Sequence, residues 1–135
     1  MKTIFMSLTF LMALNSCSSE REIKNSLVPQ MSVQELRSLR NGGEMFFLFD
    51  VRQEWEREIA LIGGSHILDE KATKLISTLS PDSLIVFYCR TGRRSQLAAE
   101  YFQTQGFTRV FNLKGGIDAW SIQIDPTVAR YKNKR

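Results

Sequence analysis

The sequence predicts an α/β fold: one domain with a mainly parallel central sheet flanked by helices on both faces. Residues 45–49 and 84–88 are continuous apolar runs, which is typical of strands buried on both faces. Segments with helical periodicity lie between such runs, and alternating strands and helices favour parallel pairing through crossover connections. A chain of 135 residues has room for one domain with a modest core.

The expected elements follow one another with turns rich in Gly, Pro and Ser between them. Helices are expected over residues 32–40, 70–79, 95–105 and 117–120. Strands are expected over residues 45–49, 84–88 and 109–113, with a further short strand ending near residue 68. The charged segment 53–58 is expected to be a loop or a single helical turn.

Local signals support the ends of two of these helices. Ser32 and Glu35 are spaced as a capping box, which predicts a helix start at Ser32. Gly42-Gly43 then stops this helix. Gly106 follows the helical segment 95–105 and is the expected left-handed residue just beyond its end.

The composition is that of an ordinary globular protein, with 43% hydrophobic and 24% charged residues. The net charge of +4 is mild, and no basic face is interleaved with aromatic residues, so no nucleic-acid partner is expected. The basic tail, residues 126–135, is expected to be a solvated terminus. A weak electrostatic hold on anionic lipid is the alternative for this tail.

The N-terminus has the pattern of an export signal. Residues 1–16 contain one early lysine and an apolar run, Ile4 to Leu14, that has the length of a signal-peptide core and is too short to span a bilayer. The segment Leu14-Asn15-Ser16-Cys17 resembles the cleavage box of bacterial lipoproteins, which implies a lipid on Cys17. A plain secretory signal with an incidental Cys17 is the alternative.

The lipoprotein interpretation sets the expected location of the domain. The polar residues 17–28 are typical of a tether that holds the domain, residues 29–125, off a membrane. We therefore expect a lipid-anchored protein of the bacterial cell envelope that faces the periplasm. With Cys17 acylated, Cys89 is the remaining thiol of the chain, so no disulfide is expected. An unpaired thiol in an oxidising compartment calls for a chemical use.

Cys89 has the most informative surroundings in the chain. It follows the apolar run 84–88, precedes the helical segment 95–105, and has three arginines within five residues. A thiol at a strand end, in a loop that opens a helix, meets free backbone N–H groups and the positive end of the helix dipole. Both favour the thiolate, so the pKa of Cys89 is expected to lie below that of a free cysteine. The loop predicts a nucleophile that handles an anionic substrate.

A second polar segment comes at an equivalent place. Asp50-Val51-Arg52 directly follows the buried run 45–49, as Cys89 follows the run 84–88. Ligands of open parallel sheets bind beyond the carboxyl ends of the strands. We therefore expect both segments at the same edge of the sheet.

Four motifs, in order along the chain, resemble the rhodanese family of sulfurtransferases in its single-domain form. They are Asp50-Val51-Arg52 for its D-V-R segment, Cys89 to Ser95 for its C-x-x-G-x-R-S loop, Gly106 to Leu113 for its G-[FY]-x-x-V-x-x-L segment, and Gly115 to Trp120 for its G-G-[IM]-x-x-W close. The resemblance covers residues 29–125 and implies the α/β fold expected above.

The resemblance also implies a reaction. A sulfane sulfur would pass from an anionic donor such as thiosulfate to a thiol or cyanide acceptor through a persulfide on the catalytic residue Cys89. The loop would cradle the persulfide anion with Arg90, Thr91, Gly92, Arg93, Arg94 and Ser95. Asp50 and Arg52 are expected to form an ion pair that braces the strand end, with contact to the donor as the alternative. This chemistry calls for no metal and no cofactor.

Two other functions stay open. The domain is alternatively a persulfide relay or binding module dedicated to one protein partner that accepts the sulfur. The third candidate is a small cysteine-loop phosphatase or arsenate reductase. Loops of that type place arginine six residues after cysteine, where this chain has Ser95; Arg94 comes at the fifth position, which makes a smaller loop.

The chain departs from the family in one segment. Many members have G-H-I-P-G-A after the D-V-R motif, whereas Leu61 and Gly63 here replace the histidine and the proline, which predicts a different local loop shape. His66 is expected to be a structural residue in or beside a strand, not a catalytic base. Trp120 is expected to anchor the core, and the sequence leaves the role of Trp55 open.

Overall fold

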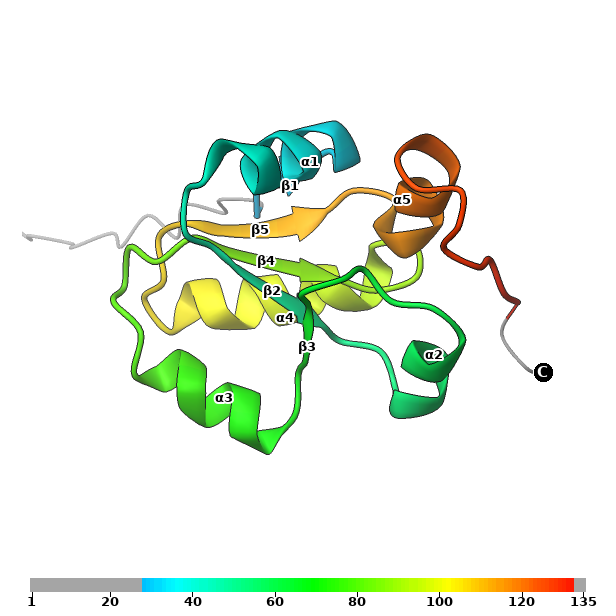
Figure 1. Ribbon diagram of the computed structural model, residues 1–135. Coiled ribbons are helices and arrows are strands. Elements are labelled where there is room, and N and C mark those ends of the chain that lie inside the picture. The colour runs from blue at the N-terminus through cyan, green and yellow to red at the C-terminus, as the bar shows by residue number, and fades with distance from the viewer. Residues whose placement is uncertain (1–27, 133–135) are drawn as a thin grey trace, which may run out of the picture.

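The computed structural model describes residues 28–132, which form a five-stranded sheet with helices on both faces (Figure 1). The strands are β1 (Gln30–Met31), β2 (Phe47–Asp50), β3 (His66–Ile67), β4 (Ile85–Tyr88) and β5 (Val110–Leu113). The helices are α1 (Val33–Gly42), α2 (Glu54–Ile59), α3 (Glu70–Ser77), α4 (Arg93–Thr104) and α5 (Gly116–Gln123). Every strand pair is parallel, in the order β1-β5-β4-β2-β3, so the predicted fold class is confirmed.

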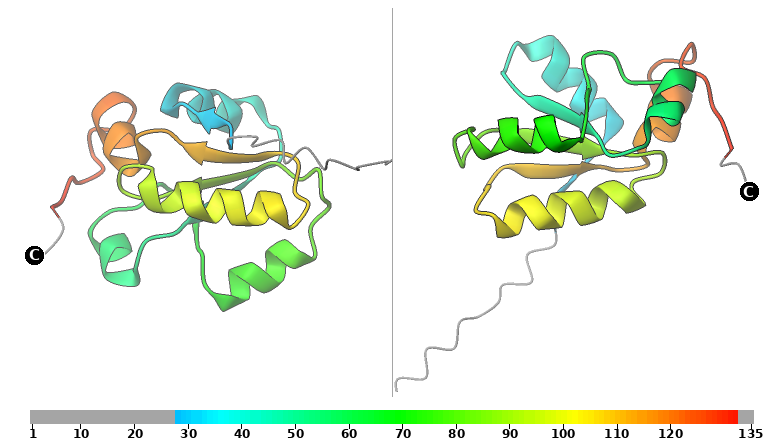
Figure 2. Two further views of the ribbon diagram at one scale, coloured as in Figure 1. Left: turned by 180° about the vertical axis from the view of Figure 1, so that it is seen from behind. Right: turned by 90° about the horizontal axis from the view of Figure 1, so that it is seen from below.

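The two faces of the sheet build two apolar layers, and β4 contributes to both. Ile85 and Phe87 face a cluster with α3 and α4, whereas Val86 and Tyr88 face a cluster with α1 and α5. Figures 1 and 2 show these helix pairs on opposite sides of the sheet. All four β4 residues are buried, and each large apolar side chain contributes on the order of 1.5–3 kcal/mol by leaving water. The unbroken apolar run of β4 therefore reflects burial on both faces.

The predicted capping box opens α1. The Glu35 N–H donates to Ser32 Oγ at 3.1 Å, and the Ser32 N–H donates to Glu35 Oε2 at 2.6 Å. The helix continues two residues past its predicted end at Arg40, and the left-handed Gly43 (φ 74°) terminates it. The start of this helix was therefore correctly predicted, and its end was placed one half-turn early.

Two elements were not predicted. β1 has two residues and pairs Gln30 with Asn112 of β5, which is too short to show a period in the sequence. The segment predicted as a loop or a single turn forms the six-residue helix α2, because the N–H of Gln53 donates to Glu56 Oε2 at 3.0 Å and caps the first turn.

The start of α4 corrects another prediction. The helix begins at Arg93, not at residue 95, because Gly92 (φ 98°) turns the chain directly into the helix. Arg93 and Arg94 thus lie in the first helical turn and not in a loop. His66 lies in β3 as predicted, and the predicted core residue Trp120 is 6% exposed.

Several predictions fall on the N-terminal segment. The signal peptide 1–16, the lipidation of Cys17 and nearly all of the tether 17–28 lie outside the described residues. Within residues 28–132 no helix combines the length and apolar composition needed to cross a bilayer. At the other end, the prediction of a solvated tail is wrong for Tyr131, which packs against the domain at the carboxyl ends of the strands.

Candidate active site

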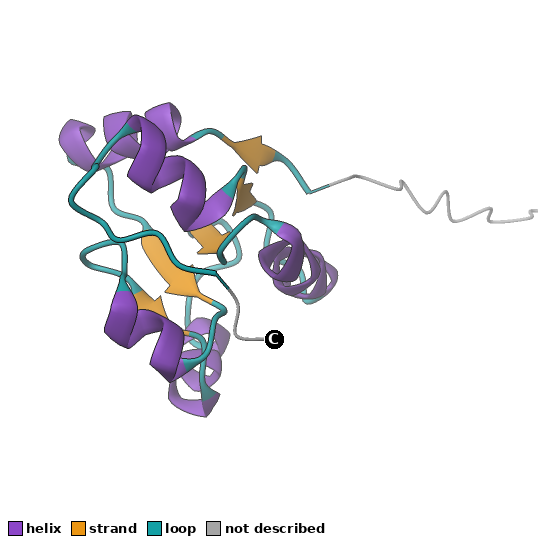
Figure 3. Ribbon diagram, turned by 90° about the vertical axis from the view of Figure 1, so that its right-hand side faces the viewer, coloured by secondary structure: helices purple, strands orange, loops and turns teal. Residues whose placement is uncertain are grey.

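Neighbouring strands bring the two predicted site segments together. Asp50 of β2 and Tyr88 of β4 are paired in register, so Asp50-Val51-Arg52 and Cys89 leave the sheet side by side. Figure 3 looks onto this edge of the sheet. The N–H of Val51 donates to the Tyr88 carbonyl at 3.0 Å, which continues the strand ladder up to the residue before the cysteine.

The loop after β4 encloses the Cys89 thiol. The Gly92 N–H donates to Sγ at 3.1 Å, and the Ser95 hydroxyl lies 3.4 Å from Sγ. Cys89 is 1% exposed, and burial by itself would raise the pKa of its thiol. The Ser95 hydroxyl and the N–H groups of Ser95, Thr91 and Gly92 outweigh that effect, so the pKa of Cys89 is lowered from its ordinary value. The loop therefore stabilises a thiolate.

Two glycines allow the loop to close this tightly. Gly92 has a φ of 98°, and a Cβ on it would lie 3.3 Å from the Leu113 carbonyl oxygen. A Cβ on Gly116 would collide with the carbonyl oxygen of Cys89. Because Gly116 has none, the start of α5 approaches the loop, and the Ile117 N–H donates to the Cys89 carbonyl at 2.9 Å.

Ser95 is oriented from the next strand. Its hydroxyl donates to Asn112 Oδ1 at 2.6 Å, and both residues are buried. The Asn112 amide donates from Nδ2 to the Gly92 carbonyl at 3.0 Å and to Gln30 Oε1 at 2.9 Å, which sets its orientation. Asn112 therefore contacts both the Gly92 turn and the hydroxyl beside Cys89, a role that its place in the motif did not indicate.

The loop arginines occupy three different environments. Arg90 lies 3.5 Å from Asp118 of α5, and Arg93 is exposed in the first turn of α4. Arg94 donates from both terminal nitrogens to the carboxylate of Glu56, at 2.8 and 2.7 Å. The rim of the loop surrounds a hollow of about 350 Å³, lined by Arg90, Thr91, Arg93, Arg94 and Leu97.

Asp50 and Arg52 form a buried ion pair. Arg52 donates from Nε to Oδ1 at 2.9 Å and from Nη2 to Oδ2 at 2.6 Å, and both side chains are 0% exposed. Arg57 reaches the same carboxylate at 3.1 Å, and Arg52 also donates to the Ala60 carbonyl at 2.8 Å. Since both side chains of the pair are fully buried and bonded to other groups of the protein, the geometry fits a bracing role.

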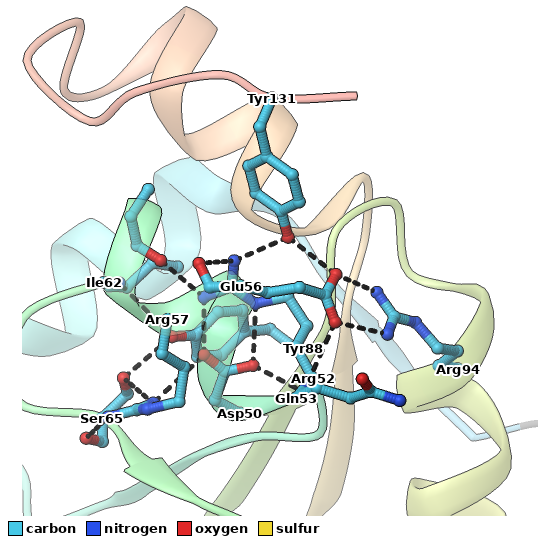
Figure 4. Close-up of polar contacts among 11 residues, drawn as sticks. Asp50, Arg52, Gln53, Glu56, Arg57, Ile62, Ser65, Tyr88, Arg94 and Tyr131 are labelled. Carbon is cyan, nitrogen blue, oxygen red and sulfur yellow. Dashed lines mark hydrogen bonds and ion pairs between the residues drawn. The ribbon is translucent and has the colours of Figure 1, made fainter. Parts of the chain in front are cut away.

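Glu56 and Tyr131 extend this ion pair to Arg94 (Figure 4). The Tyr131 hydroxyl accepts from Arg52 Nη1 at 2.8 Å and donates to Glu56 Oε1 at 2.9 Å. Burial by itself would raise the pKa of Glu56, but its hydrogen bonds, above all those from Arg94, lower it to about 2. A continuous array of charges therefore runs from the end of β2 to the first turn of α4.

The family follows from a comparison with known domains. Residues 32–123 match the rhodanese-like domain family. This chain belongs to that family. A curated relative, Rhodanese-like/PpiC domain-containing protein 12 of Arabidopsis thaliana, is 36% identical over 122 residues, which are 84% of this chain and 39% of that protein. This chain therefore spans about two fifths of that relative's length.

Two further proteins resemble the domain. Thiosulfate sulfurtransferase GlpE of Pseudomonas aeruginosa is 33% identical over 92 residues, 67% of this chain and 82% of that protein. The crystal structure of a rhodanese-like domain protein from Staphylococcus aureus superposes with a TM-score of 0.62 at 19% identity, over 78% of this chain and 100% of the other. That structure supports the rhodanese-like fold.

In this rhodanese-like domain, Leu61 and Gly63 stand where many family members have a histidine and a proline. Leu61 is 40% exposed, and Ile62 beside it is completely buried. The Ile62 N–H donates to the Tyr88 hydroxyl at 3.3 Å, and Ser65 Oγ lies 2.8 Å from the same hydroxyl. The Tyr88 hydroxyl therefore holds the segment that differs from the family pattern against β4.

The structure groups some of the predicted site residues of the rhodanese-like domain and separates others. Gly92, Ser95 and the Thr91 N–H surround the thiol, whereas Arg94 is engaged by Glu56. Their roles toward a substrate stay predictions. The residues that sequence reasoning missed are Glu56, Asn112, Tyr131 and Gln30. For Glu56 the spacing after Gln53 offered a capping signal.

Proposed function

We propose that this chain is a sulfurtransferase that carries one sulfane sulfur on Cys89. The observation that supports this most directly is the position of Sγ, which the Gly92 N–H and the Ser95 hydroxyl approach within 3.1 and 3.4 Å. An anion is favoured there by hydrogen bonds and by the N-terminus of the 12-residue helix α4. The same donors suit the thiolate and the anionic outer sulfur of a persulfide.

The first half-reaction loads the cysteine. The Cys89 thiolate attacks the outer sulfur of thiosulfate and forms a new S–S bond. The bond between the two thiosulfate sulfurs breaks, and its electron pair leaves with sulfite. The product is a Cys89 persulfide whose outer sulfur is anionic. The charge of the site is therefore unchanged, and the loop binds a sulfur anion before and after loading.

The second half-reaction unloads it. An acceptor nucleophile, a thiolate or cyanide, attacks the outer sulfur, and the S–S electron pair returns to Cys89 as thiolate. Arg90 and Arg93 at the rim would attract anionic donors and acceptors through long-range electrostatics. Because Cys89 is 1% exposed, the donor has to present a slim terminal atom to the loop.

Mass spectrometry of the intact purified protein after thiosulfate treatment tests the proposal. We expect a mass gain of one sulfur on Cys89, which cyanide removes as thiocyanate. The Cys89→Ser variant is the matched control and should stay unloaded while its circular dichroism stays unchanged. Persistent cyanide-releasable sulfur on that variant would contradict the assignment of Cys89.

The two other candidate functions give different outcomes in the same preparation. A dedicated relay would load its persulfide but release it only to one protein partner, with negligible thiosulfate:cyanide turnover. A cysteine-loop phosphatase would hydrolyse p-nitrophenyl phosphate and would gain no sulfur. The closeness of Arg94 to the cysteine in sequence favours a ligand smaller than a tetrahedral oxyanion.

We also propose that a lipid on Cys17 anchors the domain in the bacterial cell envelope, where it faces the periplasm. The support is the box Leu14-Asn15-Ser16-Cys17 behind the apolar run of residues 1–16. Metabolic labelling with an alkyne fatty acid should mark the full-length protein, and Cys17→Ala should abolish the label. A labelled variant, or an unlabelled wild-type protein in the soluble fraction, would reject the anchor.

A further inference from the structure

Tyr131 comes from outside the family domain but lies in the array beside the cysteine loop. It follows the matched residues 32–123, and its hydroxyl bridges Arg52 Nη1 and Glu56 Oε1 at 2.8 and 2.9 Å. Its ring lies 5.7 Å from the Arg52 guanidinium and meets Trp55 edge-on at 6.1 Å. Figure 4 shows the phenol over the gap between the two charged groups. Contacts with three residues therefore fix this part of the tail.

Glu56 in turn fixes Arg94. The Glu56 side chain is 2% exposed, and its carboxylate accepts from both terminal nitrogens of Arg94, the Gln53 N–H and the Tyr131 hydroxyl. Arg94 is 43% exposed on its own helix, so this two-pronged bond is what holds its guanidinium in one place. An ionised Cys89 adds a smaller attraction to the dominant effect of Glu56, and together they raise the pKa of Arg94.

We propose that Tyr131 is a positioning residue for Arg94. Its hydroxyl gives Arg52 a neutral oxygen as acceptor, so the Glu56 carboxylate stays bound to Arg94. The hydroxyl separates two ion pairs, Asp50–Arg52 and Glu56–Arg94, that would otherwise compete. Tyr131 touches no reacting atom. It acts on the charge near the thiol through Glu56.

Removing the hydroxyl has a definite consequence. Apart from Tyr131, the partner of Arg52 Nη1 among the described residues is the Glu56 carbonyl at 3.4 Å, a long contact for a buried N–H donor. The Nε and Nη2 groups of Arg52 keep Asp50 and Ala60. Nη1 would therefore take the Glu56 carboxylate. Glu56 stays in place because it is buried, whereas Arg94 is free to extend into solvent. The positive charge close to Cys89 falls, while the negative charge remains.

The experiment compares two alkylating agents on the full-length protein. Iodoacetate is an anion and iodoacetamide is neutral, and the thiolate attacks the CH2 carbon of either reagent and displaces iodide. The ratio of the two rates therefore reports the charge around Cys89 and cancels the thiolate fraction. In Tyr131→Phe we expect the iodoacetate to iodoacetamide ratio to fall by about twofold to fivefold, the scale of one nearby charge at partial exposure. Tyr101→Phe removes a hydroxyl from an exposed tyrosine of α4 and should leave the ratio unchanged.

A double-mutant cycle separates positioning from general loosening. In an Arg94→Met background the Tyr131→Phe change should have no further effect on the ratio. An equal fall in both backgrounds, or an unchanged ratio in the single variant, overturns the proposal. Thermal unfolding of each variant verifies that the compared proteins are folded.

The effect on turnover rests on the proposed sulfurtransferase function. There we expect Tyr131→Phe to raise the KM for thiosulfate and to change kcat little, because an anion is attracted less well while the thiolate is unchanged. If the wild-type protein transfers no sulfur but the alkylation ratio responds as expected, the proposed function fails and the positioning role stands.

Discussion

The Ser95 hydroxyl donates to Asn112 Oδ1 at 2.6 Å while it lies 3.4 Å from the sulfur of Cys89. A hydroxyl has one proton, so the amide oxygen and the thiolate share a single donor. The protonated thiol can donate to the Ser95 oxygen, whereas the thiolate can only accept. Ionisation of Cys89 therefore draws the Ser95 proton toward the sulfur.

Ser95→Ala should make Cys89 harder to ionise. The Ser95 hydroxyl lowers the pKa of Cys89 against the opposing effect of burial, so its removal raises that pKa. A hydrogen bond to a charged group is worth about 1.5 kcal/mol at the weak end of its range, which corresponds to roughly a tenfold loss of alkylation rate below the pKa. The pH dependence of iodoacetamide modification measures this. Ser38→Ala on α1 is the control, and equal rates in both variants would contradict the role of Ser95.

Gly92→Ala should damage the cradle more than a comparable glycine substitution elsewhere. Gly92 and Gly106 have φ values of 98° and 100°, but only at Gly92 would a Cβ lie against a backbone carbonyl. Both variants should lose about 1–2 kcal/mol of folding free energy from the left-handed conformation. Urea unfolding measures that shared cost, and sulfur loading of Cys89 should be lost only in Gly92→Ala. Full loading in that variant would show that the tight approach to Leu113 is dispensable.

Glu56→Gln should destabilise the domain in a pH-dependent way. The pKa of Glu56 is lowered to about 2, below the usual value of about 4.3, so its stabilisation is present at neutral pH and disappears as the pH falls through that window. The shift corresponds to about 3 kcal/mol at most. Urea midpoints of the wild-type and variant proteins should differ by a constant amount above pH 5 and converge toward pH 2. Parallel curves over that range would rule out an ionised Glu56 as the source.

Arg93→Ala should weaken attraction of an anionic donor. Arg93 is exposed at the rim of the hollow and lies in the first turn of α4. We expect a rise of about threefold in the KM for thiosulfate at low ionic strength that shrinks as salt is added, since exposed charges are screened. Arg37→Ala on α1 controls for net charge. A salt-independent effect, or an equal effect of both variants, would argue against electrostatic attraction at the rim.

The fold and the thiol loop were accessible from sequence because their signals are local. Each signal spans only a few consecutive residues: the apolar run of β4, the capping box at Ser32 and the glycine at the start of α4. The family resemblance joined these pieces in the correct order. Even there, the helix start was placed two residues late, since the left-handed Gly92 is itself the cap.

The partners of the site residues were not accessible in the same way. Arg94 meets Glu56, 38 positions away, and Tyr131 meets Glu56 across 75 positions. The partner of a charged side chain is set by which opposite charge the tertiary fold brings near it, and the periodicity of the sequence does not predict that partner. Asn112 looked like an ordinary strand residue because its importance comes from β1 and α4, which enclose it.

The last helix of the domain completes the loop that carries the nucleophile. The N–H groups of Ile117 and Asp118 hold the carbonyls of Cys89 and Arg90, and Gly116 permits that approach. A chain that ends before α5 lacks the donors for these two carbonyls, so the backbone course of the cysteine loop depends on a helix that follows it by more than twenty residues.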